Sequence, residues 1–405
     1  MTRERAVDFL RERVVFAKLA AIILWISYGV SIALGDGHGT FNFKGEINGA
    51  DHLAWYTAAR LIVEGKPDKV YDFEYVAHVQ NKLIPMNRWN SLMAYRNPPF
   101  YALLYLPTCQ LPFTVSWVLW CAIYLVWMWF AVKWLGGGRR EYLWLLAFFP
   151  TFTAISYGQN SLISFTILAA TYRLLKGDRI FLAGLVAGLL WFKPPMLTGL
   201  ILWGLLDIRR LWPAALGVVL SGLLLTLGTF PFIPDVWEGF VTSLTRNAKY
   251  ADFEQFKMHN PLAFWRLLVP DATAWHWPLA VACSGLAVLW FVRAWQKHRR
   301  DLAVMFGAVA FVTLWGSPHA LIYEWSVLGV TAVLWWKKLE GDPPARFVLF
   351  GTAWLALFLS THFAELQVNN TGRAVQVSIP LLAAVGVFAL KFLPRDSTAD
   401  GGGVQ

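Results

Sequence analysis

One acidic residue, Asp51, introduces a short segment with helical periodicity in the first long polar region of the chain. The apolar positions after it repeat at helical spacing: Trp55, Ala58, Ala59, Ile62 and Val63. A carboxylate at a helix start can cap free backbone N–H groups, which lowers its pKa. It can also act as a general base toward a hydroxyl group. Both roles are open for Asp51, and one residue can fill both.

Lys193 is the second residue with chemical potential, because it separates two short apolar runs and is followed by Pro194 and Pro195. A lysine at the centre of a bilayer costs about 2.5–3.5 kcal/mol on insertion scales, so we expect it at a helix break near the membrane surface. There it could anchor the chain at the interface. It could equally meet a phosphate group, with the prolines holding the break open.

Three further polar residues stand at junctions between apolar runs. Gln159 and Asn160 link two runs, and His319 follows Gly316-Ser317-Pro318 before another. A plain polar turn explains the first two. A histidine at the start of a helix, hydrogen-bonded to backbone or solvent, explains the third. Each signal is weak alone. The stronger observation is that all three, with Asp51 and Lys193, fall on connections predicted to share one side of the protein.

The composition identifies the class of protein that must position these residues. Hydrophobic residues make up 57% of the 405 residues and charged residues only 15%, against about 25% charged in soluble proteins. The net charge of +10 is spread in small clusters between apolar runs, which is typical of membrane topology signals and not of nucleic-acid binding. The three cysteines are far apart, and no cofactor or metal motif occurs, so we expect no disulfide framework, no metal and no cofactor. The prediction is an all-α polytopic membrane protein.

Twelve apolar runs approach the length of about 20 residues that a membrane-spanning helix needs. The first is too long for the apolar region of a signal peptide, so we expect it to be a retained helix. The predicted spans are Val14–Leu34, Phe113–Leu135, Tyr142–Tyr157, Ser161–Leu175, Phe181–Phe192, Met196–Leu206, Leu211–Phe232, Trp277–Trp295, Leu302–Trp315, Ala320–Trp336, Phe347–Thr361 and Ala374–Leu393.

Lysine and arginine residues near the ends of these runs orient them. With the N-terminus in the cytoplasm every predicted inner connection is basic, which is the usual bias, and both termini are cytoplasmic. The long connections, about residues 36–112 and 233–276, then lie outside. They contain amphipathic segments that we expect to lie in the interface plane, as a lid. We predict one domain over residues 1–405 with a disordered tail at 396–405.

The order of the motifs resembles a known family. They are Gly49-Ala50-Asp51-His52-Leu53-Ala54-Trp55-Tyr56, Val70-Tyr71-Asp72, Asn97-Pro98-Pro99, Tyr157-Gly158-Gln159-Asn160, Lys193-Pro194 and Ser317-Pro318-His319. Over about residues 14–340 the chain resembles the family-87 polyprenol-phosphate-sugar glycosyltransferases. It is similar to the mycobacterial mannosyltransferases that extend phosphatidylinositol mannosides.

The resemblance implies a GT-C-type bundle in the plasma (inner) membrane, with its active site facing the periplasm or exterior. It implies transfer of a hexose such as mannose from a polyprenyl-phosphate donor to a lipid or glycan acceptor, with membrane lipids as surroundings and no nucleic acid. Asp51 takes the place of the catalytic aspartate. The implied substrate-binding residues are Tyr56, Gln159, Asn160, Lys193, Arg246, Lys249, His319 and Glu324. Glu324 stands where an aspartate is expected, which leaves the role of a second acid open.

Two other classes fit the same composition. A transporter or lipid-linked oligosaccharide flippase would place ionisable residues near the middle of the membrane and often contains inverted repeats. This chain has span centres free of charge and no detectable repeat. A non-catalytic membrane subunit is the other alternative.

Overall fold

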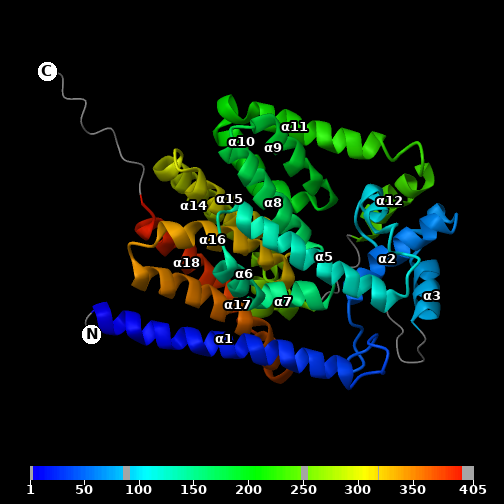
Figure 1. Cartoon of the computed structure of the whole chain (residues 1–405), viewed down its shortest axis with the longest axis horizontal. Helices are drawn as coiled ribbons and strands as arrows, with labels where there is room; N and C mark the ends of the chain where they lie inside the picture. Colours follow the sequence, from blue (N-terminus) through cyan, green and yellow to red (C-terminus); the bar gives the residue numbers. More distant parts are fainter. Residues whose placement is uncertain (1–2, 85–91, 248–253, 318, 395–405) are drawn as a thin grey trace.

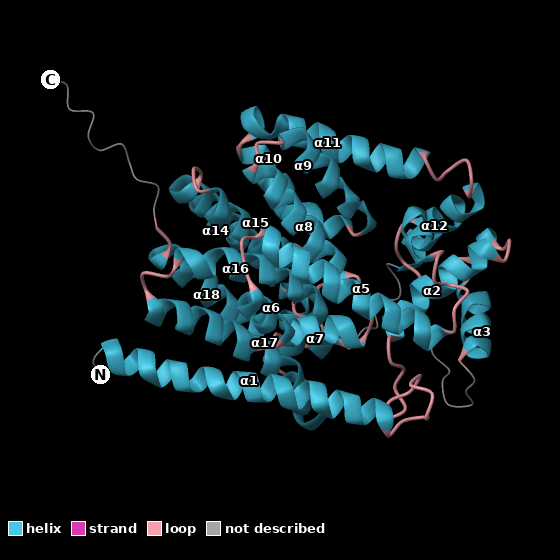
Figure 2. Ribbon diagram, in the orientation of Figure 1, coloured by secondary structure: helices cyan, strands magenta, loops and turns pink. Residues whose placement is uncertain are grey.

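The computed structural model describes residues 3–84, 92–247, 254–317 and 319–394; for residues 3–17 and 245–247 only the backbone is described. Throughout these ranges the regular secondary structure is helical (Figures 1 and 2). The α-helices are α1 (Arg3–Ala33), α2 (Ala50–Val63), α3 (Phe73–Leu83), α4 (Pro99–Ala102), α5 (Phe113–Trp134), α6 (Arg139–Leu146), α7 (Phe149–Ser156), α8 (Ser161–Lys176), α9 (Ile180–Ala187), α10 (Thr198–Leu206), α11 (Ile208–Leu227), α12 (Pro234–Asn247), α13 (Pro261–Leu268), α14 (His276–His298), α15 (Leu302–Trp315), α16 (Leu328–Lys338), α17 (Pro343–Thr371) and α18 (Ser378–Phe392).

Several helices have the length and composition of membrane spans. Within the described ranges, four helical segments are long and apolar enough to cross a bilayer: Phe113–Trp134, Ile208–Leu227, Thr273–His298 and Pro343–Thr371. Shorter apolar segments are Lys18–Ala33, Ile180–Phe192, Pro194–Leu206, Leu302–Trp315 and Ser378–Phe392. All of them overlap predicted spans. The all-helical membrane class is therefore confirmed.

Four predicted spans are not single α-helices, and two of these, 181–192 and 196–206, combine α9 and α10 with short 3₁₀ helices. The run 142–157 is divided between α6 and α7, because Phe148 is extended and Pro150 stands in the first turn of α7. The run 320–336 begins as a 3₁₀ helix, η7 (Ile322–Val327), and continues as α16. Hydropathy alone does not distinguish a broken helical run from a continuous one, so the prediction of one helix in each run is wrong.

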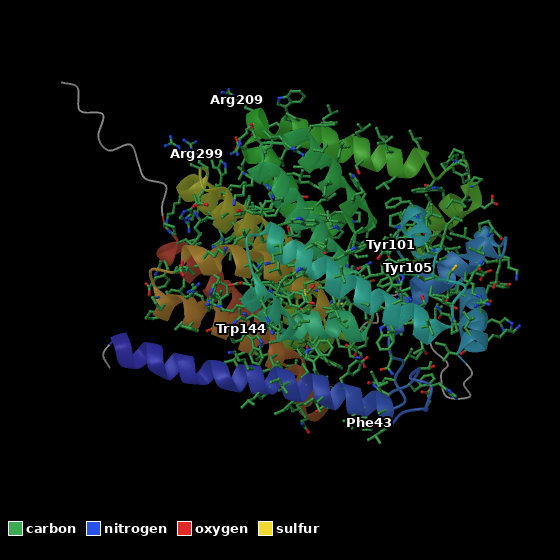
Figure 3. The ribbon with its side chains drawn as sticks, in the orientation of Figure 1. Phe43, Tyr101, Tyr105, Trp144, Arg209 and Arg299 are labelled. Carbon is green, nitrogen blue, oxygen red and sulfur yellow. The ribbon has the colours of Figure 1, made fainter. Side chains whose placement is uncertain are left out.

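The basic connections lie together at one end of the bundle. Figure 3 shows Arg209 and Arg299 toward the end of the bundle where α18 lies in Figure 1. Contacts between distant connections support this grouping: Lys337 Nζ donates to the Gly136 carbonyl, Lys338 Nζ lies 2.5 Å from Asp301 Oδ2, and His298 Nδ1 lies 2.9 Å from the Pro394 carbonyl.

The predicted outer connections meet at the opposite end, where α2, α3 and α12 are found (Figure 1). The contacts that join them are Asp51 N–H to the Tyr157 carbonyl at 3.0 Å, Asn97 Nδ2 to the Phe192 carbonyl at 2.9 Å, His259 N–H to the Ala320 carbonyl at 2.7 Å, and Ala374 N–H to the Leu267 carbonyl at 2.9 Å. The structure thus separates short basic connections from long ones, as the charge pattern predicts.

Helix α2 differs from its predicted position. We expected an amphipathic helix at a surface, but every residue from His52 to Ala59 is buried. Side chains of α5, α4 and the loop before α4 enclose it, since His52 bonds to Ser116 and Trp55 bonds to Asn97. The interface-plane prediction is wrong for α2, because its polar residues find partners inside the protein. The predicted helix at α12 is present, with Val241 62% exposed.

The centre of the bundle is α15, whose residues from Val304 to Trp315 are all buried. A helix that is apolar on every side is expected inside a bundle. It packs against α10, α14 and α16, and the Gly199 N–H of α10 donates to Thr313 Oγ1 at 3.1 Å. Because α10 follows Lys193 and α15 precedes His319, this packed pair supports two segments that carry predicted site residues.

Candidate active site

The site is built on a junction between the start of α2 and the end of α7. The N–H groups of Gly49 and Asp51 donate to the carbonyls of Ser156 and Tyr157, at 2.9 and 3.0 Å. The first N–H groups of a helix need partners, and here another helix supplies them from its C-terminal carbonyls. The junction needs Gly158 as well: its φ is +67°, and a Cβ atom there would lie 2.7 Å from the Cβ of His52.

This junction removes the predicted capping role of Asp51. The N-cap of α2 is Gly49, Asp51 lies in the first turn, and no side chain caps the helix. The cap prediction is wrong because backbone carbonyls of α7 satisfy these donors, a contact that spacing within α2 does not reveal. The carboxylate of Asp51 instead accepts a hydrogen bond from the side chain of Gln159.

Gln159 and Asn160 connect the predicted site residues. The Gln159 side chain hydrogen-bonds Asp51 and Tyr323. The next residue, Asn160, accepts a hydrogen bond from Lys193 Nζ at 3.0 Å through its Oδ1. Both amides are buried. The turn after α7 therefore joins the Asp51 carboxylate to the cation at the α9–α10 break.

Lys193 forms an ion pair with Glu324. Lys193 separates two short 3₁₀ helices, η3 (Gly188–Phe192) and η4 (Pro194–Leu197), so the chain breaks where predicted. Its side chain is 20% exposed and that of Glu324 is 3% exposed. The second carboxylate oxygen of Glu324 is buried without a hydrogen-bond partner among the described residues. Glu324, whose role was open, is thus the counter-ion of Lys193.

Asn97 connects α2 to the segment that precedes Lys193. Asn97 accepts a hydrogen bond from the Trp55 indole and donates to the Phe192 carbonyl, both at 2.9 Å. It therefore bridges α2 and the residue that precedes Lys193. Tyr71 donates to the Asn97 carbonyl at 2.6 Å, and Asp72 caps α3. Residues of three of the short motifs quoted from the sequence therefore belong to one network of contacts.

Further cations lie on the His319 side of the site. His319 is exposed, and desolvation together with the nearby guanidinium groups of Arg96 and Arg266 lowers its pKa. Sequence reasoning missed both arginines, although Arg96 directly precedes the Asn97-Pro98-Pro99 motif; Arg266 lies in none of the quoted motifs. Of the predicted cations, Lys249 and the side chain of Arg246 lie outside the described residues.

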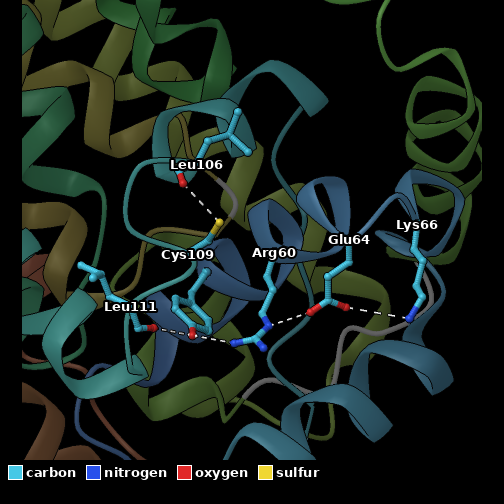
Figure 4. A network of polar contacts seen from close by, with 7 residues as sticks. Arg60, Glu64, Lys66, Leu106, Cys109 and Leu111 are labelled. Atoms are coloured by element: carbon cyan, nitrogen blue, oxygen red, sulfur yellow. Dashed lines mark hydrogen bonds and ion pairs between the residues drawn. The ribbon is translucent and has the colours of Figure 1, made fainter.

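Tyr56 lies apart from this cluster. It is 1% exposed, its hydroxyl donates to the Leu111 carbonyl at 2.8 Å, and Arg60 donates to that hydroxyl at 3.2 Å. Arg60 continues to Glu64 and Lys66 on the far side of α2 (Figure 4). Among the described residues the Tyr56 hydroxyl contacts Leu111 and Arg60 and none of the residues around Asp51, so the structure places Tyr56 outside this cluster.

The surroundings of Asp51 set its acidity. Burial raises its pKa from 3.8 to about 6, against the lowering effects of Gln159 and Lys193, and the nearby Glu324 raises it further. This is opposite to the lowered pKa of a helix cap, because burial outweighs any field from the α2 N-terminus. The next residue, His52, is buried with its pKa lowered to about 3, so it is neutral. A carboxylate with a pKa near 6 is ionised at neutral pH and more basic than an ordinary aspartate.

Among the described residues no group of three histidine, cysteine, aspartate or glutamate side chains is arranged to hold a metal ion. The reactive features are one carboxylate, an adjacent ion pair and a set of cations. Tyr157, 39% exposed, marks where the cluster reaches the surface. A carboxylate base beside cations suits displacement of an anionic leaving group by a hydroxyl group.

The family model of glycosyltransferase family 87 matches residues 95–318, more than half of the chain. The chain belongs to glycosyltransferase family 87. It is therefore a glycosyltransferase enzyme, as the motif order predicted. No curated protein and no solved structure matches the chain.

The matched region contains Asn97, Gln159, Asn160 and Lys193 of this family-87 enzyme and ends one residue before His319. Asp51 lies outside the match. Its assignment therefore rests on the contacts that bring it to Gln159 and near Lys193, both of which lie inside the match.

Gly158→Ala tests the α2–α7 junction. We expect turnover to fall roughly tenfold or more, because the new Cβ atom displaces His52 and with it Asp51. Strain at positive φ adds about 1–3 kcal/mol of destabilisation. Gly45→Ala is the matched control, since Gly45 has φ +78° but nothing within 4 Å of an added Cβ atom. Equal activities of the two variants would show that the junction does not position Asp51.

Proposed function

We propose that this enzyme is an inverting GT-C-type glycosyltransferase that transfers a hexose, mannose by resemblance, from a polyprenyl phosphate to a hydroxyl group of a lipid or glycan acceptor. The observation that carries the proposal is the placement of Asp51. Its carboxylate is hydrogen-bonded to the side-chain amide of Gln159. The nearby cation Lys193 already forms an ion pair with Glu324. Among the described residues Asp51 has no ion-pair partner, so it can accept a proton.

In this proposal Asp51 takes the proton from the acceptor hydroxyl as the oxygen forms its bond to the anomeric carbon. The bond from that carbon to the phosphate oxygen breaks on the opposite side, which inverts the configuration. The leaving group is a stable phosphate anion, so the reaction needs no strong general acid. It does need positive charge near the phosphate. Gln159 holds the carboxylate in place and leaves its charge intact.

The cations suited to that phosphate are Arg96, Arg266 and Lys193, with His319 as a hydrogen-bond donor. Arg96 and Arg266 lie near His319, and Arg96 adjoins Asn97, which bonds to the residue before Lys193. Guanidinium groups bind phosphate oxygens in pairs and stay charged at all relevant pH values. Arg96 and Arg266 are therefore candidate phosphate ligands in addition to Arg246 and Lys249, which stay predictions.

We infer that the twelve apolar runs cross the plasma membrane, with some formed by paired short helices. Both termini and the basic connections then face the cytoplasm, and the site lies on the periplasmic or exterior side. Nucleotide sugars stay in the cytosol, so a lipid-linked donor suits this side. The basic residues gathered at the end opposite Asp51 support the orientation. Family membership favours transfer over transport or a subunit role.

The test of this proposal is sugar transfer by the purified enzyme in lipid nanodiscs. We expect transfer of radiolabelled mannose from polyprenyl-phosphate mannose to a lipid acceptor, and none from guanosine-diphosphate mannose. Transfer from the nucleotide sugar alone would contradict the proposed donor. A transferred sugar other than mannose would revise only the hexose.

The pH dependence of the same reaction provides a separate prediction. The base must be unprotonated, and the Asp51 pKa is about 6. The rate should therefore be constant above about pH 7 and fall towards tenfold per pH unit below about 6. His319→Gln is the control, because a histidine could titrate in the same range. If the fall in rate below about pH 6 is lost in His319→Gln, the group that is protonated there is His319 and not Asp51.

A further inference from the structure

An apolar cavity of about 740 Å³ lies far from the Asp51 site. Its lining comes mainly from α6, α16, α17 and α18, with Ala20 of α1, Phe148, and Phe311 of α15 completing it. The helices α6, α16, α17 and α18 lie beside one another in Figure 1, away from α2 and α3. Ligand cavities in proteins measure about 300–1,000 Å³. Glu141 and Thr352 are the main polar members of an otherwise hydrocarbon and aromatic lining.

Two guanidinium groups share one aromatic ring at the border of this cavity. Trp336 lines the cavity. The guanidinium carbon of Arg346 lies 3.9 Å from its ring centroid, and that of Arg140 lies 5.2 Å away. Lys18 approaches a second lining residue, Trp144, at 5.9 Å, and Figure 3 shows Trp144 close to α1.

The same border contains hydrogen-bond donors without acceptors. Nε of Arg346 and Nε1 of Trp336 are both buried and have no hydrogen-bond partner among the described residues. Buried hydrogen-bond donors normally have an acceptor, so these two donors indicate a ligand that supplies one. Glu141, 3.8 Å from Arg140, and Glu340 offset part of the positive charge, but neither accepts from Arg346 Nε or Trp336 Nε1. One Glu141 oxygen accepts from the Gly138 N–H at 2.8 Å instead.

The charge and shape together indicate the chemistry of the ligand. Two like charges beside one indole repel each other, and an anion between them offsets that repulsion. A phosphate group has the oxygen acceptors that a guanidinium and an indole N–H need. The adjoining cavity is lined mainly by apolar side chains, which suits hydrocarbon. Basic pockets between helices at the cytoplasmic side of a membrane suit anionic lipid headgroups.

We propose that this cavity binds one anionic phospholipid, with its phosphate between Arg140 and Arg346 and an acyl chain in the apolar cavity. The aromatic edge of Trp336 lies at the boundary of the two parts, which suits an amphipathic ring. The site is separate from the proposed transfer reaction and does not depend on the identity of donor or acceptor.

Retention of lipid by the purified full-length protein tests the proposal, measured by native mass spectrometry after exchange into phosphatidylglycerol or phosphatidylcholine. We expect the wild type to retain one phosphatidylglycerol molecule in preference to phosphatidylcholine. Arg140→Gln/Arg346→Gln should reduce phosphatidylglycerol retention roughly tenfold or more. The matched two-charge control is Arg209→Gln/Arg210→Gln, which alters exposed arginines at the same end.

A second variant tests the apolar part. Gly351 lines the cavity, and an added Cβ atom there meets nothing within 4 Å, so Gly351→Leu should occupy the acyl-chain space without a backbone clash. Gly285→Leu in α14 is its control, since Gly285 has the same open surroundings and is not part of the lining. We expect retention of both lipids to fall in Gly351→Leu only, with an unchanged melting temperature.

Equal retention by Gly351→Leu and Gly285→Leu would overturn the acyl-chain site. The headgroup site would be overturned if the Arg140→Gln/Arg346→Gln variant retained as much phosphatidylglycerol as the wild type. Equal binding of phosphatidylglycerol and phosphatidylcholine by the wild type would overturn it as well.

Discussion

Asp51→Asn is expected to reduce turnover by at least about 10²-fold, because positioned base catalysis contributes about 10²–10⁴-fold. Asparagine has nearly the same shape and can still hydrogen-bond Gln159, but it cannot accept the acceptor proton. The measurement is the initial rate of sugar transfer at pH 7.5, with saturating donor and acceptor.

Thermal stability supplies the matching control for Asp51→Asn. Burial raises the Asp51 pKa to about 6 from 3.8, so folding favours the protonated form. Its ionised carboxylate therefore destabilises the fold above about pH 6, and this penalty disappears as the pH falls through about 4. Asp51→Asn should melt at the same or a higher temperature than the wild type at pH 7.5, with a smaller difference near pH 4. Near wild-type transfer by a stable variant would place the base elsewhere, with Asp72 and Glu324 next to test.

Lys193→Met is expected to destabilise the protein by about 3–5 kcal/mol, because it leaves the carboxylate of Glu324 buried without its counter-ion. A loss of activity in this variant alone would therefore mix unfolding with catalysis. Lys193→Met/Glu324→Gln removes both charges and should recover most of the stability. Denaturant unfolding of the wild type, both single variants and the double variant measures the coupling between the two residues.

Donor use by the double variant then separates two roles of Lys193. If Lys193 contacts the donor phosphate, the double variant should need roughly 10- to 100-fold more donor, the equivalent of one lost charged hydrogen bond of about 1.5–3 kcal/mol. If Lys193 serves only to neutralise Glu324, the stable double variant should show a wild-type KM for donor. Arg266→Gln provides a comparison, since Arg266 is a proposed phosphate ligand and belongs to none of the described salt bridges.

Much of the architecture could be predicted because hydropathy and charge act locally. An apolar run must leave water wherever it occurs, so α5, α11, α14 and α17 could be located from composition. Basic residues at the ends of runs sort connections into two sets, and the contacts between Lys338 and Asp301 and between His298 and Pro394 join members of one set. The short motifs marked Gln159, Asn160 and Lys193 as residues of one site because their order and predicted face agreed.

The state of each site residue was decided by contacts across long sequence separations. Asp51 does not cap α2, because α7 supplies carbonyls to the first N–H groups of that helix. Asp51 is less acidic than expected because burial raises its pKa. Glu324 is the partner of Lys193 although 131 residues separate them. The approach of Arg96 and Arg266 to His319 likewise joins residues far apart in the sequence. Charge, hydropathy and helix periodicity are properties of neighbouring residues and can be read along the chain, whereas desolvation and ion pairing depend on which atoms the fold brings within a few ångströms.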